Sequence, residues 1–214
     1  MALTADPPRD CPRCPRLVAF RSKNRTAQPA WFNGAVPSFG DPRAALVIVG
    51  LAPGLQGANR TGRPFTGDYA GDLLYATLLK FGLARGTYGR DPSDGLELVD
   101  TLITNAVRCV PPENKPTPAE IATCNGFLRE ALDSLSAARA VLALGRIAHE
   151  AVLRALGLKL STHSFVHGAI HKLPGARSLV DSFHCSRLNT NTKRLTPAMF
   201  EDAVAKAKTL AGLA

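Results

Sequence analysis

Two pairs of cysteines, far apart along the chain, constrain how it can fold. Cys11 and Cys14 form a C-x2-C pair near the N-terminus, whereas Cys109 and Cys124 lie mid-chain with fourteen residues between them. Four thiolates suit a tetrahedral zinc ion and an iron-sulfur cluster equally well. A site built from all four would fasten the N-terminal arm to the middle of the fold.

Other interpretations of the cysteines have less support. A thioredoxin-like redox pair is disfavoured, because Cys11 and Cys14 do not follow a predicted strand. Cys185 belongs to neither pair. Unrelated buried thiols are the alternative to a metal site.

Length and charge bound the class of protein. The 214 residues are enough for one α/β domain, and we expect a single domain over residues 1–214. Lys and Arg number 26 against 17 Asp and Glu, so the net charge is +9 and the pI is about 9.7. This balance favours a polyanionic partner, either nucleic acid or a membrane surface, although a merely basic protein shares it.

The sequence gives no sign of membrane insertion or export. No apolar run approaches the roughly 20 residues that span a bilayer, and the N-terminus lacks a basic region followed by an apolar stretch. We therefore expect a cytoplasmic protein with no membrane partner. In that reducing compartment disulfides are disfavoured, which leaves metal ligation or buried thiols.

Strand-like and helix-like segments alternate along the chain. Short aliphatic runs predict four buried strands, at 45–51, 102–107, 140–144 and 178–183. Helical periodicity falls between and after them, at 72–81, 118–135, 146–156 and 197–210. The alternation predicts an α/β fold with a central parallel sheet of about four strands and helices on both faces.

One predicted helix has a clear start, and two segments read as loops. Thr117, Pro118 and Glu120 form a T-P-x-E sequence, which favours a capping box at the start of the helix. The Pro, Gly, Asp and Asn content of 86–95 and 111–118 is typical of loops.

The carboxyl ends of the predicted strands bring several polar and glycine residues to one edge. Ligands of parallel α/β sheets bind at that edge. Gly50 to Gly54, Asn105 and His184 each lie near or just beyond a strand end, so we expect them to share one site. The segment that follows the first strand is rich in glycine, which lets a backbone approach a ligand closely. It matches neither a Walker A loop nor a dinucleotide-binding fingerprint, and a Gly-rich surface loop is the alternative.

Several motifs together resemble the uracil-DNA glycosylase superfamily, and most closely its family 5 branch. They are GLAPG with GANRTGRPFTGD after the first strand, TNAVRC, the four cysteines, and SFHCSRLNTNTKRLT. The likeness runs from about Cys11 to Thr196, in the order that the family has. It implies a monofunctional enzyme that excises uracil in base excision repair, and four cysteines that hold a structural 4Fe-4S cluster rather than zinc.

The resemblance also implies roles for single residues. Phe65 would stack on the extruded base, Asn105 would read its edge, and His184 would donate to its O2 carbonyl. Backbone N–H groups of Ala52, Pro53 and Gly54 would line the base pocket. Without the family, a core Phe, a strand-end cap and a structural histidine are the simpler interpretations.

The chain also departs from other branches of the superfamily. Leu51 and Ala52 stand where several branches carry a residue that positions water, and neither can do so. Asp68 is the acidic residue that the family 5 resemblance offers for this role, and helix capping is its rival role. Cys185 and Arg187 replace prolines of the usual His-Pro-Ser-Pro motif, so the rigidity of this loop is in question.

DNA contacts are expected from the segment after His184. Leu188 would fill the space left by the flipped nucleotide, and polar neighbours would contact phosphates. These neighbours are Arg187, Asn189, Asn191, Lys193 and Arg194. We expect a monomer whose partner is DNA containing uracil or other deaminated bases such as hypoxanthine.

Two functions of other classes compete with this one. A non-catalytic iron-sulfur module that binds DNA or responds to redox state could use the same fold, because a fold does not fix a function. A zinc-dependent nucleic-acid hydrolase has less support, since no H-x-E motif and no clustered His and Asp ligand set with an open metal position is visible.

Overall fold

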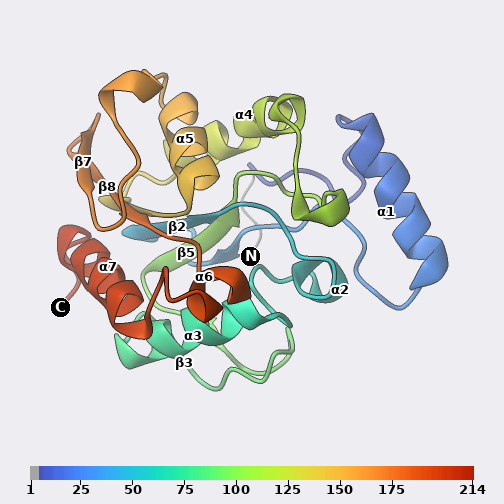
Figure 1. Ribbon diagram of the computed structural model, residues 1–214, viewed down its shortest axis with the longest axis horizontal. Coiled ribbons are helices and arrows are strands. Elements are labelled where there is room, and N and C mark those ends of the chain that lie inside the picture. Colours follow the sequence, from blue (N-terminus) through green and yellow to red (C-terminus); the bar gives the residue numbers. More distant parts are fainter. Residues whose placement is uncertain (1–4) are drawn as a thin grey trace.

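Four parallel strands form the centre of the molecule. The computed structural model describes residues 5–214, and Figure 1 shows the sheet between two layers of helices. The central strands are β2 (Leu46–Gly50), β5 (Thr101–Asn105), β6 (Ala140–Leu144) and β8 (Arg177–Ser182). All residues of β2, β5 and β6 are buried, as expected for strands covered on both faces. They correspond to the four predicted strands.

The sheet has six strands rather than about four, in the order β1-β5-β2-β6-β8-β7. The two additional strands, β1 (Phe39–Gly40) and β7 (Ile170–Leu173), pair antiparallel at the two edges. Neither has a buried aliphatic run, since β1 has two residues and β7 is largely exposed, so periodicity could not detect them. A separate two-stranded sheet joins β3 (Ala84–Arg85) to β4 (Glu97–Leu98).

The four predicted helices are present, with small shifts at their ends. They are α3 (Tyr69–Lys80), α4 (Pro118–Ser134), α5 (Arg146–Ala155) and α7 (Pro197–Leu210). Five further helical segments were not predicted: α1 (Pro15–Ala27), α2 (Ala58–Thr61), α6 (Arg187–Asn191) and the 3-10 turns η1 (Pro112–Asn114) and η2 (Leu160–Thr162). Among the described residues, no helix has both the length and the apolar character needed to cross a membrane.

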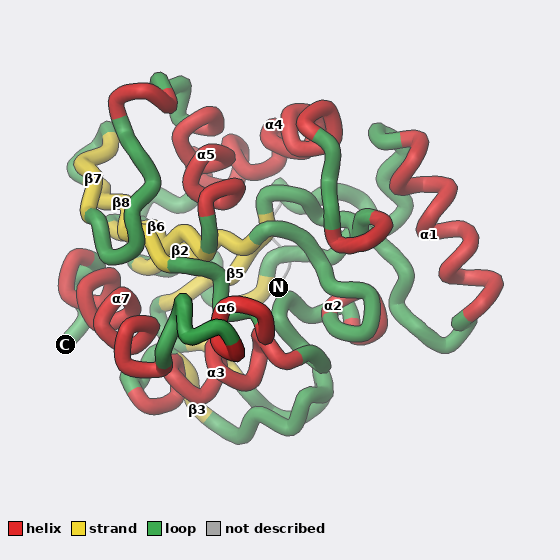
Figure 2. Tube along the Cα trace, in the orientation of Figure 1, coloured by secondary structure: helices red, strands yellow, loops and turns green. Residues whose placement is uncertain are grey.

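Alternation along the strands divides the core into two layers. Each layer lies under one of the two groups of helices that Figure 2 shows in red on either side of the yellow strands. Val47 and Val141 pack with α4 and α5, whereas Ile48 and Leu142 pack with α3 and α7. Successive side chains of a strand point to opposite faces, so each central strand contributes to both layers. The predicted arrangement of helices on both faces is therefore confirmed.

The capping box of α4 is formed as predicted. Thr117 Oγ1 accepts a hydrogen bond from the Glu120 N–H at 3.2 Å, and the Glu120 carboxylate accepts one from the Thr117 N–H at 2.8 Å. Arg16 of the arm helix α1 donates to both oxygens of the same carboxylate, at 2.8 and 2.7 Å. The start of α4 thus also holds the N-terminal arm.

We expect Thr117→Ala to lower the free energy of unfolding by about 1 kcal/mol, because an N-cap side chain contributes roughly that much. Urea unfolding followed by circular dichroism measures the change. Thr209→Ala, in the exposed last turn of α7, is the matched control and should change the free energy by less than about 0.5 kcal/mol. Equal effects of the two substitutions would contradict a capping role.

Candidate active site

A cleft of about 930 Å³ opens at the carboxyl ends of the parallel strands. Every residue predicted to bind the base or to act in catalysis lines it, together with four of those predicted to contact DNA. The predicted residues in the lining are Ala52, Pro53, Gly54, Phe65, Asp68, Asn105, His184, Arg187, Leu188, Asn189 and Arg194. Asn191 is not part of the lining and is exposed at the end of α6. The strand-end rule therefore located the cleft.

Asn105 and Phe65 meet where β2 and β5 end. Gly50 pairs with Asn105 in the parallel register, and a Cβ on Gly50 would collide with the Asn105 amide oxygen and the Phe65 ring. Asn105 is 3% exposed, and its Oδ1 has no hydrogen-bond partner among the described residues. Such an orphaned buried acceptor costs about 1–3 kcal/mol unless a ligand supplies a donor.

The backbone at Phe65 is in the left-handed region, with φ of 52°. This conformation is unfavourable for a bulky residue and persists only when its surroundings enforce it. Tyr75 donates to the carbonyl oxygen of Pro64 at 2.6 Å, and Tyr88 donates to that of Phe65 at 3.2 Å. Arg63 forms a buried bidentate pair with Asp94, at 2.8 and 2.7 Å. Together these contacts aim the Phe65 ring into the cleft.

His184 lies beside Phe65 beyond the end of β8. The two rings are roughly parallel, with centroids 5.9 Å apart and an interplanar angle of 29°. Burial lowers the pKa of His184 to about 4, because the charged form is disfavoured away from water. The imidazole is therefore neutral near pH 7 and offers one N–H donor and one acceptor.

Asp68 faces two ways at the start of α3. Its Oδ1 accepts a hydrogen bond from the Gly71 N–H at 3.3 Å, which is an N-cap. Its Oδ2 lies against the Gly-rich turn after β2, since a Cβ on Gly54 would come within 2.7 Å of it and one on Gly57 closer still. Burial raises the pKa of Asp68, and the N–H groups of Gly71 and Ala70 oppose that shift. Capping and a place in the cleft are therefore compatible, because each uses a different oxygen.

Leu188 projects from the rim of the cleft. It is 71% exposed, the most exposed of the large apolar side chains in the described part of the chain. Ser186 caps α6 by accepting from the Asn189 N–H at 3.4 Å. The Asn189 side chain donates from Nδ2 to the His184 carbonyl at 2.8 Å, so this amide braces the histidine loop. The sequence did not indicate that contact.

Other residues of the cleft were missed by sequence reasoning. They are Tyr69, Ala70, Glu113, Asn114, Lys115, Arg146, Phe165, Val166, His167 and Phe183, among others. Tyr69 follows Asp68 and Phe183 precedes His184, so their positions next to predicted site residues could have indicated them. Residues 165–167 belong to no recognised motif, and only the cluster of histidines around them would have drawn attention.

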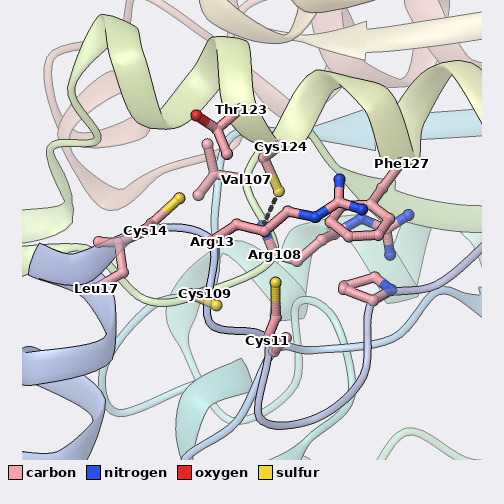
Figure 3. A pocket seen from close by; sticks show the side chains of 12 residues that line it. Cys11, Arg13, Cys14, Leu17, Val107, Arg108, Cys109, Thr123, Cys124 and Phe127 are labelled. Carbon is pink, nitrogen blue, oxygen red and sulfur yellow. Dashed lines mark hydrogen bonds between the residues drawn. The ribbon is translucent and has the colours of Figure 1, made fainter.

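The four cysteines line one small cavity beside α1 and α4 (Figure 3). Cys14 is the N-cap residue of α1, and Cys124 lies within α4. Arg21 donates from Nη1 to Cys109 Sγ at 3.6 Å, and the Arg108 N–H donates to Cys124 Sγ at 3.3 Å. The apolar part of the wall is formed by Leu17, Ala35, Val107 and Phe127.

Burial makes Cys109 and Cys124 poor thiolates in the absence of a cation. It raises the pKa of Cys109 to about 12 and also raises that of Cys124. Within the described part of the chain, the four sulfurs are not among the ligand atoms that converge to within 4.8 Å of one another. Sulfurs on one tetrahedral zinc lie about 3.8 Å apart, given a Zn–S bond of about 2.3 Å. A cluster that binds each thiolate through a different iron tolerates wider spacing.

Comparison with known proteins identifies the family. The family model for the uracil DNA glycosylase superfamily matches residues 37–208. The chain therefore belongs to the uracil-DNA glycosylase superfamily, an α/β fold with its cleft at the strand ends.

Individual relatives narrow the family to one branch. The chain is 48% identical over 209 residues to a type-5 uracil-DNA glycosylase of Thermus thermophilus, covering 95% of this chain and 94% of that protein. Type-5 uracil-DNA glycosylases of Mycobacterium leprae and Pyrobaculum aerophilum are 43% and 41% identical, each over 95% of this chain and over 92% and 90% of their own lengths. The predicted resemblance to the family 5 branch is confirmed.

We expect the His184 ring to stay neutral down to about pH 4. A histidine in the unfolded chain has a pKa near 6.5. Between about pH 6.5 and pH 4, His184 is therefore protonated in the unfolded state and neutral in the folded state. The contribution of His184 should therefore lower the free energy of unfolding as the pH falls from about 6.5 toward 4. NMR titration of the ring, assigned with a His184→Asn variant, measures the pKa of His184 in the folded protein. A midpoint near 6.5 would contradict burial of the neutral form.

Proposed function

We propose that this protein is a monofunctional DNA glycosylase that flips uracil out of DNA and hydrolyses its N-glycosidic bond in base excision repair. The observation that carries this proposal is the orphaned Oδ1 of Asn105, buried at the base of the cleft beside Phe65 and a neutral His184. Uracil presents an imide N–H between two carbonyl groups. An amide side chain can accept from that N–H and donate to the adjacent carbonyl.

His184 and the turn after β2 would stabilise the departing base. Negative charge builds on the base as the C1′–N bond breaks, and donors aimed at the O2 carbonyl lower the barrier. A neutral imidazole donates one N–H without bringing a competing positive charge. Backbone N–H groups of Ala52 to Gly54 line the same cleft and would assist.

Asp68 would orient the attacking water and offset the positive charge that develops on the sugar. Its Oδ2 faces the turn at Gly54, and Glu113 is the other acidic residue that lines the described cleft. The role requires an ionised carboxylate. Burial opposes ionisation, and the two backbone N–H groups at the start of α3 favour it.

The rim of the cleft would contact the DNA. Leu188 would occupy the space of the flipped nucleotide. The phosphate contacts would come from Arg187, Asn189, Asn191, Lys193 and Arg194. The net charge of +9 suits such a partner. We infer a monomer that acts on DNA in the cytoplasm, with deaminated purines such as hypoxanthine as further substrates of the roomy cleft.

The four cysteines would hold a 4Fe-4S cluster in the cavity between α1 and α4. The four cysteines line one cavity, and Arg21 and the Arg108 N–H donate to two of the sulfurs. Such a cluster would supply the positive charge that keeps the four thiolates, three of them buried, ionised. Its role would be structural, since it would tie residues 11–14 to the rest of a single domain.

A module that only binds DNA is not favoured. Such a protein needs basic residues, but it gains nothing from a buried unpaired acceptor or from a neutral histidine at the bottom of a cleft. The Asn105, His184 and Asp68 arrangement is expected for a site that takes up a base.

Asp68→Asn should slow uracil excision by about 10²- to 10⁴-fold, the usual range for a positioned acid or base. Asparagine caps helices as well as aspartate does, so the start of α3 is preserved. The measurement is single-turnover cleavage of a labelled duplex with one uracil, followed by alkali to break abasic sites. Asp72→Asn, one turn later and paired with the exposed Arg90, should retain the wild-type rate.

The two variants separate capping from chemistry. Wild-type turnover by Asp68→Asn would leave Asp68 with a capping role only. Strand breakage without alkali would contradict a monofunctional enzyme. Failure of the wild type to release uracil, hypoxanthine or any other deaminated base from such duplexes would overturn the proposed function.

Cys109→Ser should abolish the visible absorbance of the purified protein and its iron and labile sulfide content. Loss of one of four ligands would also lower the thermal midpoint, because the N-terminal arm would keep only its other contacts, such as the Arg16–Glu120 pair. Cys185→Ala is the matched control, since Cys185 is buried in the other core layer with α3 and α7. Zinc in place of iron in the wild-type protein would contradict the cluster.

A further inference from the structure

Residues 163–169, between η2 and β7, form one wall of the cleft without belonging to any motif. Phe165, Val166 and His167 line it, and Val166 is 59% exposed. A segment this exposed needs contacts that fix its position if it is to shape a site. Two histidines and one aspartate, outside the residues already assigned, supply those contacts.

His149 of α5 is held between two acceptors. Its Nδ1 lies 2.7 Å from Asp181 Oδ1, and its Nε2 lies 2.8 Å from the backbone carbonyl oxygen of His163. A carbonyl can only accept, and so can an ionised carboxylate. With Asp181 ionised, both ring nitrogens carry protons, and His149 is an imidazolium whose two N–H groups join β8 to the start of the wall segment.

Asp181 of β8 is fully buried and binds the segment at further points. Its Oδ2 accepts from His171 Nε2 at 2.9 Å and from the Val166 N–H at 3.3 Å, and its backbone carbonyl accepts from the Gly168 N–H at 2.8 Å. The ring nitrogens of His149 and His171 and the carboxylate of Asp181 lie close enough together to be considered as ligands of one metal ion. Their separations of 2.7 and 2.9 Å are those of direct hydrogen bonds, whereas nitrogen and oxygen ligands on one tetrahedral zinc lie about 3.3 Å apart.

His167 has the opposite protonation requirement at the other end of the segment. The Phe183 N–H donates to His167 Nδ1 at 3.1 Å, so this nitrogen must be free of a proton. The His167 ring also stacks on Phe183, with centroids 4.9 Å apart and an interplanar angle of 12°. Phe183 precedes His184 in the chain, and His167 therefore bears directly on the backbone that carries that histidine.

We propose that His149, Asp181 and His167 are positioning residues of the cleft: they fix residues 163–169 as its wall and, through the Phe183 N–H, set the place of His184. The proposal rests on the proposed function, because it assigns these residues to the same site. Misplacing a reacting group by about 1 Å can cost 10²-fold in rate.

The two histidines give the wall a working range of pH. Burial opposes the charge on His149, but the hydrogen bond and negative charge of Asp181 outweigh it and raise the pKa of His149. Burial and the charge of Lys206 lower the pKa of His167. Protonation of His167 loosens the wall on the acid side, and loss of the His149 proton loosens it on the alkaline side. The groups that face the His149 ring are Asp181, His171, Glu150 and the His163 carbonyl. Those that face the His167 ring are Lys206, Asp202, Asp181 and Phe183.

The protonation states are tested without reference to activity. Long-range proton–nitrogen NMR correlations of the purified protein at pH 7 should show both nitrogens of His149 protonated and Nδ1 of His167 unprotonated. A neutral His149 ring at pH 7, or a His167 ring protonated at Nδ1, would overturn the proposal whatever the enzyme does.

The positioning role is tested by substitutions at His167. An Asn side chain can place its Oδ1 near the position of Nδ1 and accept from the Phe183 N–H, whereas Leu cannot. His167→Leu should slow single-turnover uracil excision by about 10- to 100-fold, and His167→Asn should stay within about 3-fold of wild type. His163→Gln is the matched control, because only the backbone carbonyl of His163 holds His149.

The pH profile tests His149. Wild-type excision should fall as the pH rises through the pKa of His149, and His149→Gln should show a lower rate without that alkaline fall. Equal losses in His167→Leu and His167→Asn would mean that the His167 ring acts directly on the substrate and would overturn positioning through Phe183. Wild-type protein that excises no deaminated base overturns the proposed function instead, and the NMR result still decides the state of the wall.

Discussion

The parallel register that sets Gly50 of β2 opposite Asn105 of β5 is the constraint on which the cleft depends. Because Gly50 has no side chain, the space at the end of the two strands is filled by the Phe65 ring and the Asn105 amide. Phe65 reaches it only through a left-handed backbone, held by the hydroxyls of Tyr75 and Tyr88. A side chain at position 50 would displace both groups, so the base of the cleft follows from one strand pairing and one glycine.

Much of the fold could be predicted because its signals are local. The strands β2 and β6 are continuous apolar runs, β5 and β8 each have an aliphatic centre, and α4 and α7 start with Thr-Pro, which supplies a cap and a fixed φ. The rule that ligands bind at strand ends was enough to predict that Asn105 and His184 share one site. The position of Asp68 in the cleft could not be predicted from local sequence, because a residue before a helix is expected to be a cap. Only the family resemblance indicated a place in the cleft.

The features that were missed depend on contacts between distant residues. The buried face of α1 is formed by Leu17, Arg21 and Asn24, so its apolar periodicity is weak, and the helix is stabilised by what it packs against. The wall at residues 163–169 is ordered by His149 and Asp181, which are 32 positions apart. No pattern in a single stretch of sequence reports such a pairing, which exists only once β8 lies beside α5.

The cysteine cavity has a consequence for the order in which the chain can complete its fold. Cys11 and Cys14 leave the ribosome roughly 110 residues before Cys124, which at about 5–20 residues per second is on the order of ten seconds. During that interval two thiols of the arm are in water without their partners or the shielding of α4. The nascent chain therefore passes through a stage in which the two thiols of the arm are exposed, and this stage ends only after the first half of α4 has emerged and packed against the arm.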